Sequence, residues 1–504
     1  MIESLLPVLV AIPLFAAGLA VLIRRAIWQR VLMIAVPTLT SLVGALLVVV
    51  HYKTPVIAHN VGEYLGGVAI VFASDTLSAL MLFVTGFITA ISSGYLISTK
   101  EDRFRFVPAL VLMLTAGVNG ALLTGDLFNL FVFVEVMLLP SYALIAVTGS
   151  WRRLGVGRLF VIVNLVTSTI LVLAVGFVYG VTGTVNLAKL VEAAKDNPQL
   201  SLAAAVVLFA LLVKSGVVPV HGWLPRSYPA TSAGVMALFS GIHTKVGLYA
   251  VYRIYSTIYG GNVSWLNIFV VLVIATVVIG AISTFGERRL RGALAFQMVS
   301  GVGQILIGLI IFTELSLAAG LLYLVHHVIT MGALIMASGA IETTYGNGRL
   351  DRLHGLMKRE PVVAGVTAFG FLSLVGLPPT SGLWGKLGLL RATAESNPFY
   401  SPWLIGAVVV ASIISLMALQ RIWVKVFWGP PMKYFFPDDP LTSRGEQTEL
   451  TSETRVTRKQ LWPATLLISL SVALFVGFGF IWPVFVQAAH CLIDPAEYVK
   501  AVLG

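Results

Sequence analysis

Four ionisable residues stand inside long apolar runs of the sequence: Glu135, Lys214, Lys245 and Lys386. A charge at the centre of a membrane helix costs roughly 2.5–3.5 kcal/mol, so such side chains face a bundle interior or a water-filled cavity. A structural ion pair, or a lysine whose head extends to the interface, is the alternative interpretation. Glu135 is too short for that extension and lies about eight residues into its run.

These residue types suit proton transfer. Burial in a low-dielectric medium disfavours the charged form of a lysine, and a nearby carboxylate restores it. A Glu–Lys pair in a partly hydrated core can therefore change its protonation when its surroundings change. Arginine stays protonated and is less suited to this role; the sequence places it in predicted loops and at the ends of the apolar runs. We therefore expect the glutamate and the three lysines to move protons.

Histidines are the remaining candidates for a relay. His326 and His327 are adjacent, so on a helix they point about 100° apart, and we expect at most one of them to face any single pathway. Each could equally be a hydrogen-bonded core histidine. His221 could cap a broken helix or give protons access to it, and we interpret His243 as structural.

Two short stretches interrupt apolar runs with the same pattern, G-x-x-P-x-x-G. They are GVVPVHG at 216–222 and GLPPTSG at 376–382. Paired broken helices in two halves of a chain indicate a transporter built from repeats, with its ion site at the breaks. The second break lies five runs after the first, which predicts a five-helix unit whose second copy is inverted. The residues expected to break the helices are Gly216, Pro219, Gly376, Pro378 and Pro379.

The elements that carry these residues are membrane helices. The 504 residues are 58% hydrophobic and only 11% charged, whereas about a quarter of a soluble chain is charged. Runs near 20 residues long are sufficient to cross the hydrocarbon core, and we predict an all-α polytopic membrane protein with about 14 transmembrane helices. The predicted spans are 5–23, 31–50, 75–98, 106–124, 127–148, 158–181, 201–222, 232–252, 265–285, 292–312, 315–341, 361–390, 402–428 and 462–488.

The distribution of Lys and Arg predicts the orientation. Loops after odd-numbered spans hold 24 of these residues, and loops after even-numbered spans hold five, Arg253 among them. The positive-inside rule therefore places both termini on the non-cytoplasmic side of a cell (plasma) membrane. The net charge of +11 follows from this topology, and we expect no nucleic-acid partner. Asp75 and Asp126 begin the third and fifth spans, where a capping carboxylate is expected.

We expect a single membrane domain over 1–504. Its predicted parts are the N-terminal helices 1–105, a first repeat 106–258, a second repeat 259–428, a cytoplasmic loop 429–460, and a last helix and tail 461–504.

Other chemistries leave no trace in the sequence. It has no G-x-x-x-x-G-K-[ST] nucleotide loop, no H-E-x-x-H and no C-x-x-C-H haem motif. The single cysteine, Cys491, excludes an intrachain disulfide and a cysteine-rich metal site. We therefore expect no cofactor and no metal site, and a secondary ion transporter subunit in place of an enzyme.

Three stretches carry a family resemblance: GDLFNLFVFVE at 125–135, KSGVVP at 214–219 and TKVGLY at 244–249. They are similar to the antiporter-like subunits of respiratory complex I. More closely, they resemble the D subunit of Mrp-type multisubunit sodium/proton antiporters. The stretch GLPPTSGLWGK at 376–386 is similar to the second broken helix of that family. The resemblance runs through most of the chain.

The resemblance implies fourteen helices with two inverted five-helix units, helices 4–8 and 9–13, of which helices 7 and 12 are broken. It implies that Glu135 and Lys214 interact, and that Lys245 and a helix-11 histidine connect to Lys386 at mid-membrane. It also implies a hetero-oligomer with other membrane subunits. One departure is visible, because several relatives have a lysine four residues after that histidine and this chain has Met331.

Three functions follow as hypotheses. The first is a proton-translocating subunit of a multisubunit antiporter that exchanges sodium, or another monovalent cation, for protons. The second is the corresponding subunit of complex I or of a membrane-bound hydrogenase. The third is a transporter that works alone. The GDLFNLFVFVE stretch favours the first hypothesis.

Overall fold

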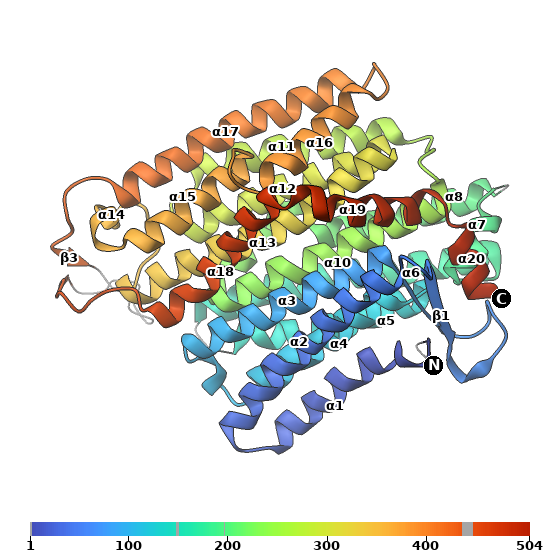
Figure 1. Ribbon diagram of the computed structural model, residues 1–504, viewed down its shortest axis with the longest axis horizontal. Coiled ribbons are helices and arrows are strands. Elements are labelled where there is room, and N and C mark those ends of the chain that lie inside the picture. The colour runs from blue at the N-terminus through green and yellow to red at the C-terminus, as the bar shows by residue number, and fades with distance from the viewer. Residues whose placement is uncertain (1–2, 148–150, 196, 436–446) are drawn as a thin grey trace.

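A bundle of long helices makes up the protein (Figure 1). The computed structural model describes residues 3–147, 151–195, 197–435 and 447–504. Within them, twelve helices have the length and composition to cross a membrane. The longer helices are α1 (Val8–Leu22), α2 (Ala26–Val50), α3 (Thr76–Ser98), α4 (Val107–Leu123), α5 (Leu127–Ala146), α6 (Trp151–Thr182), α8 (Pro198–Ser215), α10 (Ala233–Tyr259), α11 (Leu266–Gly286), α12 (Leu290–Ile311), α13 (Glu314–Tyr345), α15 (Pro361–Val375), α16 (Gly382–Ala394), α17 (Ser401–Phe427), α18 (Arg458–Val476) and α19 (Phe478–Ile493).

Short elements connect the bundle at its two ends. Two small antiparallel sheets pair β1 with β2 and β3 with β4. The short elements are the helices α7 (Leu187–Ala193), α9 (Trp223–Ser227), α14 (Leu356–Arg359) and α20 (Ala496–Leu503), and the strands β1 (Val56–Asn60), β2 (Val71–Asp75), β3 (Tyr434–Phe435) and β4 (Thr448–Glu449).

Each predicted span coincides with one helix or with a pair of helices, and two details differ. The seventh and twelfth spans are discontinuous, as predicted: α8 is followed by α9, and α15 by α16. The last span also divides, into α18 and α19 on either side of Gly477. The assignment of Arg253 to a loop is wrong, because α10 continues to Tyr259 and buries it. Of the predicted loop 429–460, residues 436–446 lie outside the described residues.

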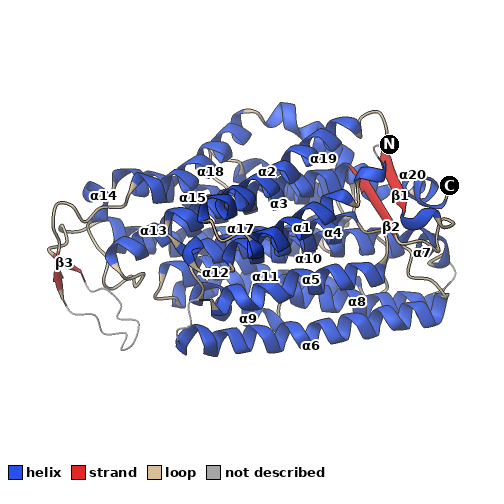
Figure 2. Ribbon diagram, turned by 90° about the horizontal axis from the view of Figure 1, so that it is seen from below, coloured by secondary structure: helices blue, strands red, loops and turns tan. Residues whose placement is uncertain are grey.

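Both termini lie at the same end of the bundle, beside the β1–β2 sheet, and β3 lies at the opposite end (Figures 1 and 2). The loops at the opposite end carry the larger number of Lys and Arg residues that the sequence assigns to the cytoplasmic side. We call this end of the bundle, opposite the termini, the basic end.

Helices α10 and α13 form the centre of the bundle. The most apolar 18-residue stretch of each is entirely buried, whereas only 39% of the corresponding stretch is buried in α6 and in α17. In the second view α6 runs along one edge of the bundle (Figure 2). Hydroxyl side chains begin both central helices, because Ser232 and Thr313 accept hydrogen bonds from the N–H groups of the first turn. The centre of the bundle therefore holds Lys245 of α10 and the two histidines of α13.

Two isolated β-bridges support the predicted inverted repeat. One pairs Asp126 with Asn186 and the other pairs Arg289 with Arg349, both antiparallel. Each bridge joins the residue that starts the second predicted helix of a unit to the segment that follows the third. The first lies at the end that holds the termini and the second at the basic end. The repeat boundaries themselves stay a prediction.

Candidate functional site

The two helix breaks have matching backbone geometry. α8 ends at Gly216 with φ of 83°, and α15 ends at Gly376 with φ of 91°. In each break the next two N–H groups turn back onto carbonyls of the last turn: Gly216 and Val217 bond to Val213 and Leu212, and the second break repeats this pattern. Glycine is favoured at this left-handed position because it has no Cβ. The sequence prediction of two breaks is confirmed.

Lys214 lies in the last turn of α8, directly before the first break. Only 7% of it is exposed, and its Nζ donates a 2.9 Å hydrogen bond to Oγ of Ser168 on α6. An enclosed cavity of about 10 Å³, measured as space for the centres of water molecules, adjoins it. That volume is close to the minimum for one water. Lys214, Asn164 and His243 all line the cavity.

Glu135 lies on α5, and its charge acts on Lys214. Its side chain is half-buried, and its Oε1 atom is buried without a hydrogen-bond partner. A carboxylate oxygen in this state favours a nearby cation. The structure therefore brings Glu135 and Lys214 into electrostatic contact without joining them in a direct ion pair.

His243, which the sequence suggested to be structural, lies beside Lys214. The charge of Lys214 acts on it, and its Nε2 is 2.7 Å from Oγ of Ser141 on α5. Its ring also packs edge-on against Phe239 and Phe160. Its position two residues before Lys245 was visible in the sequence, but the position relative to Lys214 depends on the packing of α10 against α8.

Lys386 lies in α16, after the second break, and reaches back across it. Its Nζ donates to the carbonyl oxygens of Leu374 and Val375, both at 2.9 Å, and to Oγ of Ser412 at 3.0 Å. An ammonium group has three hydrogens, so every donor is used. The last carbonyls of a helix lack intrahelical donors and carry partial negative charge, which favours a cation there.

Lys245 and the two histidines of α13 form the central part of the candidate site. Lys245 is fully buried, and its Nζ donates to Oγ1 of Thr244 at 3.1 Å. The charge of Lys245 acts on His327, and the charge of Lys386 acts on both His326 and His327. The adjacent rings point to different neighbours, as helix geometry requires. Each ring has a lysine among its electrostatic neighbours, and which of the two serves a relay stays a prediction.

The two histidines have different surroundings. His327 packs against α12, where a Cβ atom at Gly301 would lie 2.1 Å from its Nε2. His326 Nδ1 is 3.0 Å from Oγ of Ser381 in the second break. That hydroxyl is 2.8 Å from Oγ of Ser471 on α18. The hydroxyl cluster was not identified from the sequence, because isolated serines carry no motif.

His221 lies in the turn between the halves of the first broken helix. Its side chain lies beside the backbone of Pro219 in this turn. Both the capping role and the proton-access role of His221 stay predictions. Asp75 and Asp126 do cap their helices, because they accept from the backbone N–H groups of Ser78 and Asn129.

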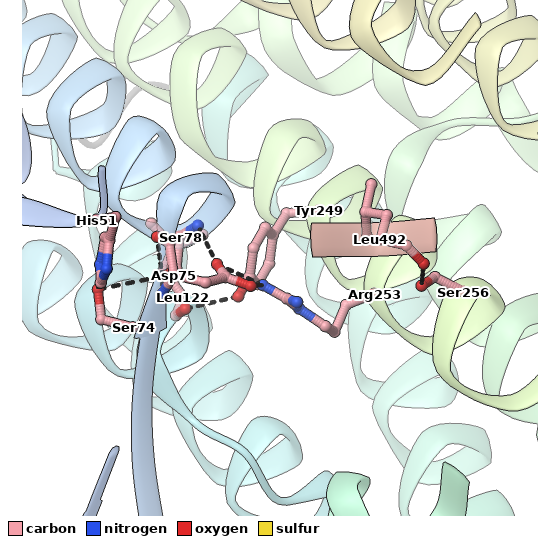
Figure 3. Close-up of polar contacts among 9 residues, drawn as sticks. All are labelled: His51, Ser74, Asp75, Ser78, Leu122, Tyr249, Arg253, Ser256 and Leu492. Carbon is pink, nitrogen blue, oxygen red and sulfur yellow. Dashed lines mark hydrogen bonds and ion pairs between the residues drawn. The ribbon is translucent and has the colours of Figure 1, made fainter. Parts of the chain in front are cut away.

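Asp75 also forms a buried ion pair that the sequence did not predict (Figure 3). Nη2 of Arg253 lies 2.7 Å from Oδ2 and 2.8 Å from Oδ1. The guanidinium lies over the rings of Tyr249 and Tyr498, so it also fixes α20 to the bundle. This pair lies toward the end of the bundle that holds the termini.

The protein is a multi-pass helical bundle with buried lysines beside two broken helices. These features define its class as an integral membrane protein of the kind that includes secondary transporters. In the part of the chain that the structure describes, no three His, Cys, Asp or Glu residues gather as metal ligands.

Comparison with known proteins then identifies the family. The model of the NADH:quinone oxidoreductase/Mrp antiporter transmembrane family matches residues 124–415. The chain is 31% identical to the D subunit of the Na(+)/H(+) antiporter of Bacillus subtilis, over 99% of each chain. It is 32% identical to the D subunit of the Na(+)/H(+) antiporter of Alkalihalophilus pseudofirmus, over 92% of each. The chain belongs to the NADH:quinone oxidoreductase/Mrp antiporter family.

Solved structures show the same fold. A chain of the Mrp complex from a Dietzia species matches with a TM-score of 0.94 and 40% identity, over 100% of both chains. A chain of respiratory complex I from Thermus thermophilus matches with a TM-score of 0.78 at 22% identity, over 99% of this chain and 100% of that one, and this likeness concerns the fold alone. The resemblance seen in the sequence is confirmed.

Proposed function

We propose that the chain is the proton-translocating D-type subunit of a multisubunit sodium/proton antiporter. The observation that carries this proposal is two series of ionisable groups beside the two broken helices, within each of which every group is in electrostatic contact with the next. The relatives from Bacillus subtilis and Alkalihalophilus pseudofirmus, which are named as Na(+)/H(+) antiporter subunits, support the choice of ions.

The proposed proton path has two segments. The first contains Glu135, Lys214 and His243; the second contains Lys245, His327, His326 and Lys386. The body of α10 lies between them, because His243 and Lys245 are two residues apart on one helix and point to different sides. A water chain through this boundary would complete the path.

Electrostatic coupling links the protonation of neighbouring groups along the proposed path. Charges inside the protein interact through a medium of lower dielectric constant than water. Loss of a proton from Lys245 or Lys386 therefore changes the proton affinity of the histidine beside it. Lys386 differs from Lys214 because three acceptors stabilise its ammonium form. When only one of the two lysines is protonated, Lys386 therefore keeps its proton in preference to Lys214.

We further propose that the subunit lies in the plasma membrane with both termini outside the cytoplasm, beside other membrane subunits. The excess of Lys and Arg at the basic end supports this orientation. The match to a chain of the Mrp complex supports the assembly. Glu135 is the only acid well inside a predicted span, which argues against a dedicated sodium site built by this chain alone.

The test is transport by the purified complex in proteoliposomes. An outward sodium gradient is applied, and the internal pH is followed with an enclosed dye. We expect a sodium-dependent pH change that disappears when the complex is prepared without this chain. Proton movement that requires NADH and ignores sodium would instead identify the complex I hypothesis, and full antiport by this chain alone would identify a transporter that works by itself.

A further inference from the structure

A pocket of about 380 Å³ lies at the basic end, where α11 and α17 end. Five charged residues line it: Glu287, Arg288, Asp351, Arg421 and Lys425. None of them belongs to the proton path proposed above. The pocket therefore needs an explanation of its own.

Both carboxylates of the pocket already have partners. Oε1 of Glu287 accepts the backbone N–H groups of Arg288 and Arg289, at 2.9 and 3.2 Å. Asp351 accepts two hydrogen bonds from Arg349, at 3.0 and 2.7 Å. These side-chain hydrogen bonds lower the pKa of Asp351 to about 2, so at neutral pH it stays ionised and paired. Asp351 is thus paired with Arg349, whereas Glu287 bonds only neutral N–H groups and keeps its negative charge. With three cations and two carboxylates, the lining of the pocket carries a net charge of +1.

The cations, in contrast, retain free donors. Arg421 uses its Nη2 to bond the carbonyl oxygen of Glu287 at 2.9 Å, and its guanidinium lies 5.9 Å from the centre of the Phe285 ring. Its Nε is buried without a hydrogen-bond partner. Arg288 and Lys425 are exposed. Three cationic side chains on two helix ends thus face one pocket.

The surface below this pocket is apolar and exposed. On α17, Met417 and Ile413 lie one and two turns below Arg421 on the same side and are 55% and 53% exposed. On α11, Ile282 lies one turn below the pocket and is 52% exposed. Trp428, also 52% exposed, follows α17 on the other side of the cations. Tryptophan is enriched at the boundary between membrane and water, so the cations lie at headgroup depth.

We propose that this pocket binds the headgroup of an anionic phospholipid, whose acyl chains cover Ile282, Ile413 and Met417. Basic pockets between helix ends on the cytoplasmic side are suited to phosphate groups of lipids. The phosphate accepts hydrogen bonds from Arg421 and the two exposed cations, while the apolar stripe excludes a freely dissolved phosphate as the preferred ligand. This site is independent of the proposed transport function.

The experiment uses the purified complex in nanodiscs of phosphatidylcholine that contain a small fraction of photoactivatable phosphatidylglycerol. Mass spectrometry maps the labelled peptides. We expect labelling of 282–288 and 413–428, and at least fivefold less labelling when the probe has a choline headgroup. Each cation near an anionic surface contributes a factor of about five, so Arg288→Gln with Lys425→Gln reduces labelling roughly 25-fold.

The double variant leaves Arg421 in place, because Arg421 also holds the end of α11. A charge-matched control, Lys358→Gln with Lys433→Gln, removes two exposed cations of the basic end outside the pocket and should leave labelling within twofold of the parent. Soluble glycerol phosphate at millimolar concentration should not compete. Equal labelling by both headgroups, labelling unaffected by the double variant, or protection of this face by another subunit would each overturn the proposal.

Discussion

Substitution of Lys386 by methionine, compared with the same change at Lys214, tests the geometry of the second break. Methionine keeps most of the apolar stem and removes the ammonium group. At Lys386 the change leaves two buried carbonyl oxygens, those of Leu374 and Val375, without their donor. At Lys214 it leaves only the hydroxyl of Ser168, which can rotate to a carbonyl of its own helix.

The magnitude follows from these partners. Both variants are made in a Glu135→Gln background, so that Lys214→Met leaves no carboxylate without its cation. Removal of a buried lysine charge then relieves roughly 2.5–3.5 kcal/mol in both variants, and this term cancels in the comparison. Each buried carbonyl left without a donor costs roughly 1–3 kcal/mol. Lys386→Met should therefore destabilise the protein by about 2–6 kcal/mol more than Lys214→Met does.

The assay is reversible unfolding of the purified protein in mixed micelles, with the free energy of unfolding compared among parent and variants. Lys386→Arg, which keeps a cation, serves as a control that should lie closer to the parent than Lys386→Met. Equal destabilisation by the two methionine variants would refute the conclusion that Lys386 completes the end of α15.

Three further predictions concern the breaks, the relay and the buried ion pair. Gly382→Ala should prevent normal assembly, because its Cβ would lie 2.0 Å from the carbonyl oxygen of Ser373. At the matching position of the first break, the Cβ of Gly222→Ala would meet nothing within 4 Å, so this variant should be tolerated. Size-exclusion chromatography of the complex compares the two variants. His326→Gln and His327→Gln should each slow sodium-dependent proton movement about tenfold or more, while His490→Gln, an exposed control, leaves the rate unchanged. Asp75→Asn should destabilise the fold by about 3–5 kcal/mol, since it leaves Arg253 buried without its partner, and adding Arg253→Met should recover part of the loss in the same unfolding assay. Burial alone would raise the pKa of Asp75, but the charge of Arg253 and the Ser78 N–H lower it below its usual value, so this stabilisation is present above about pH 4 and is lost as the pH falls through the lowered pKa.

Local sequence signals predicted the helices and the breaks. A membrane helix satisfies its own backbone, so hydropathy alone identifies most of its length. The breaks at Gly216 and Gly376 could also be predicted from the sequence, because the left-handed positions that these residues occupy favour glycine. The division at Gly477 was missed, since a single glycine within an apolar run does not by itself distinguish a continuous helix from a broken one.

Contacts between distant segments could not be predicted in this way. Asp75 and Arg253 are 178 residues apart in the sequence. Arg253 was assigned to a loop because a buried cation near a helix end has the same local sequence pattern as an exposed one. The position of His243 beside Lys214, and the bonds from Lys386 to the end of α15, likewise depend on how helices pack. The residue types indicated proton chemistry, but their order along a path required the fold.

The most direct test of the central claim is transport by Glu135→Ala, Lys214→Ala and Lys386→Ala in the reconstituted complex, with assembly confirmed for each variant. The proposed path predicts that each substitution abolishes sodium-dependent proton movement while the complex remains intact. Normal transport in any two of the three variants would contradict it.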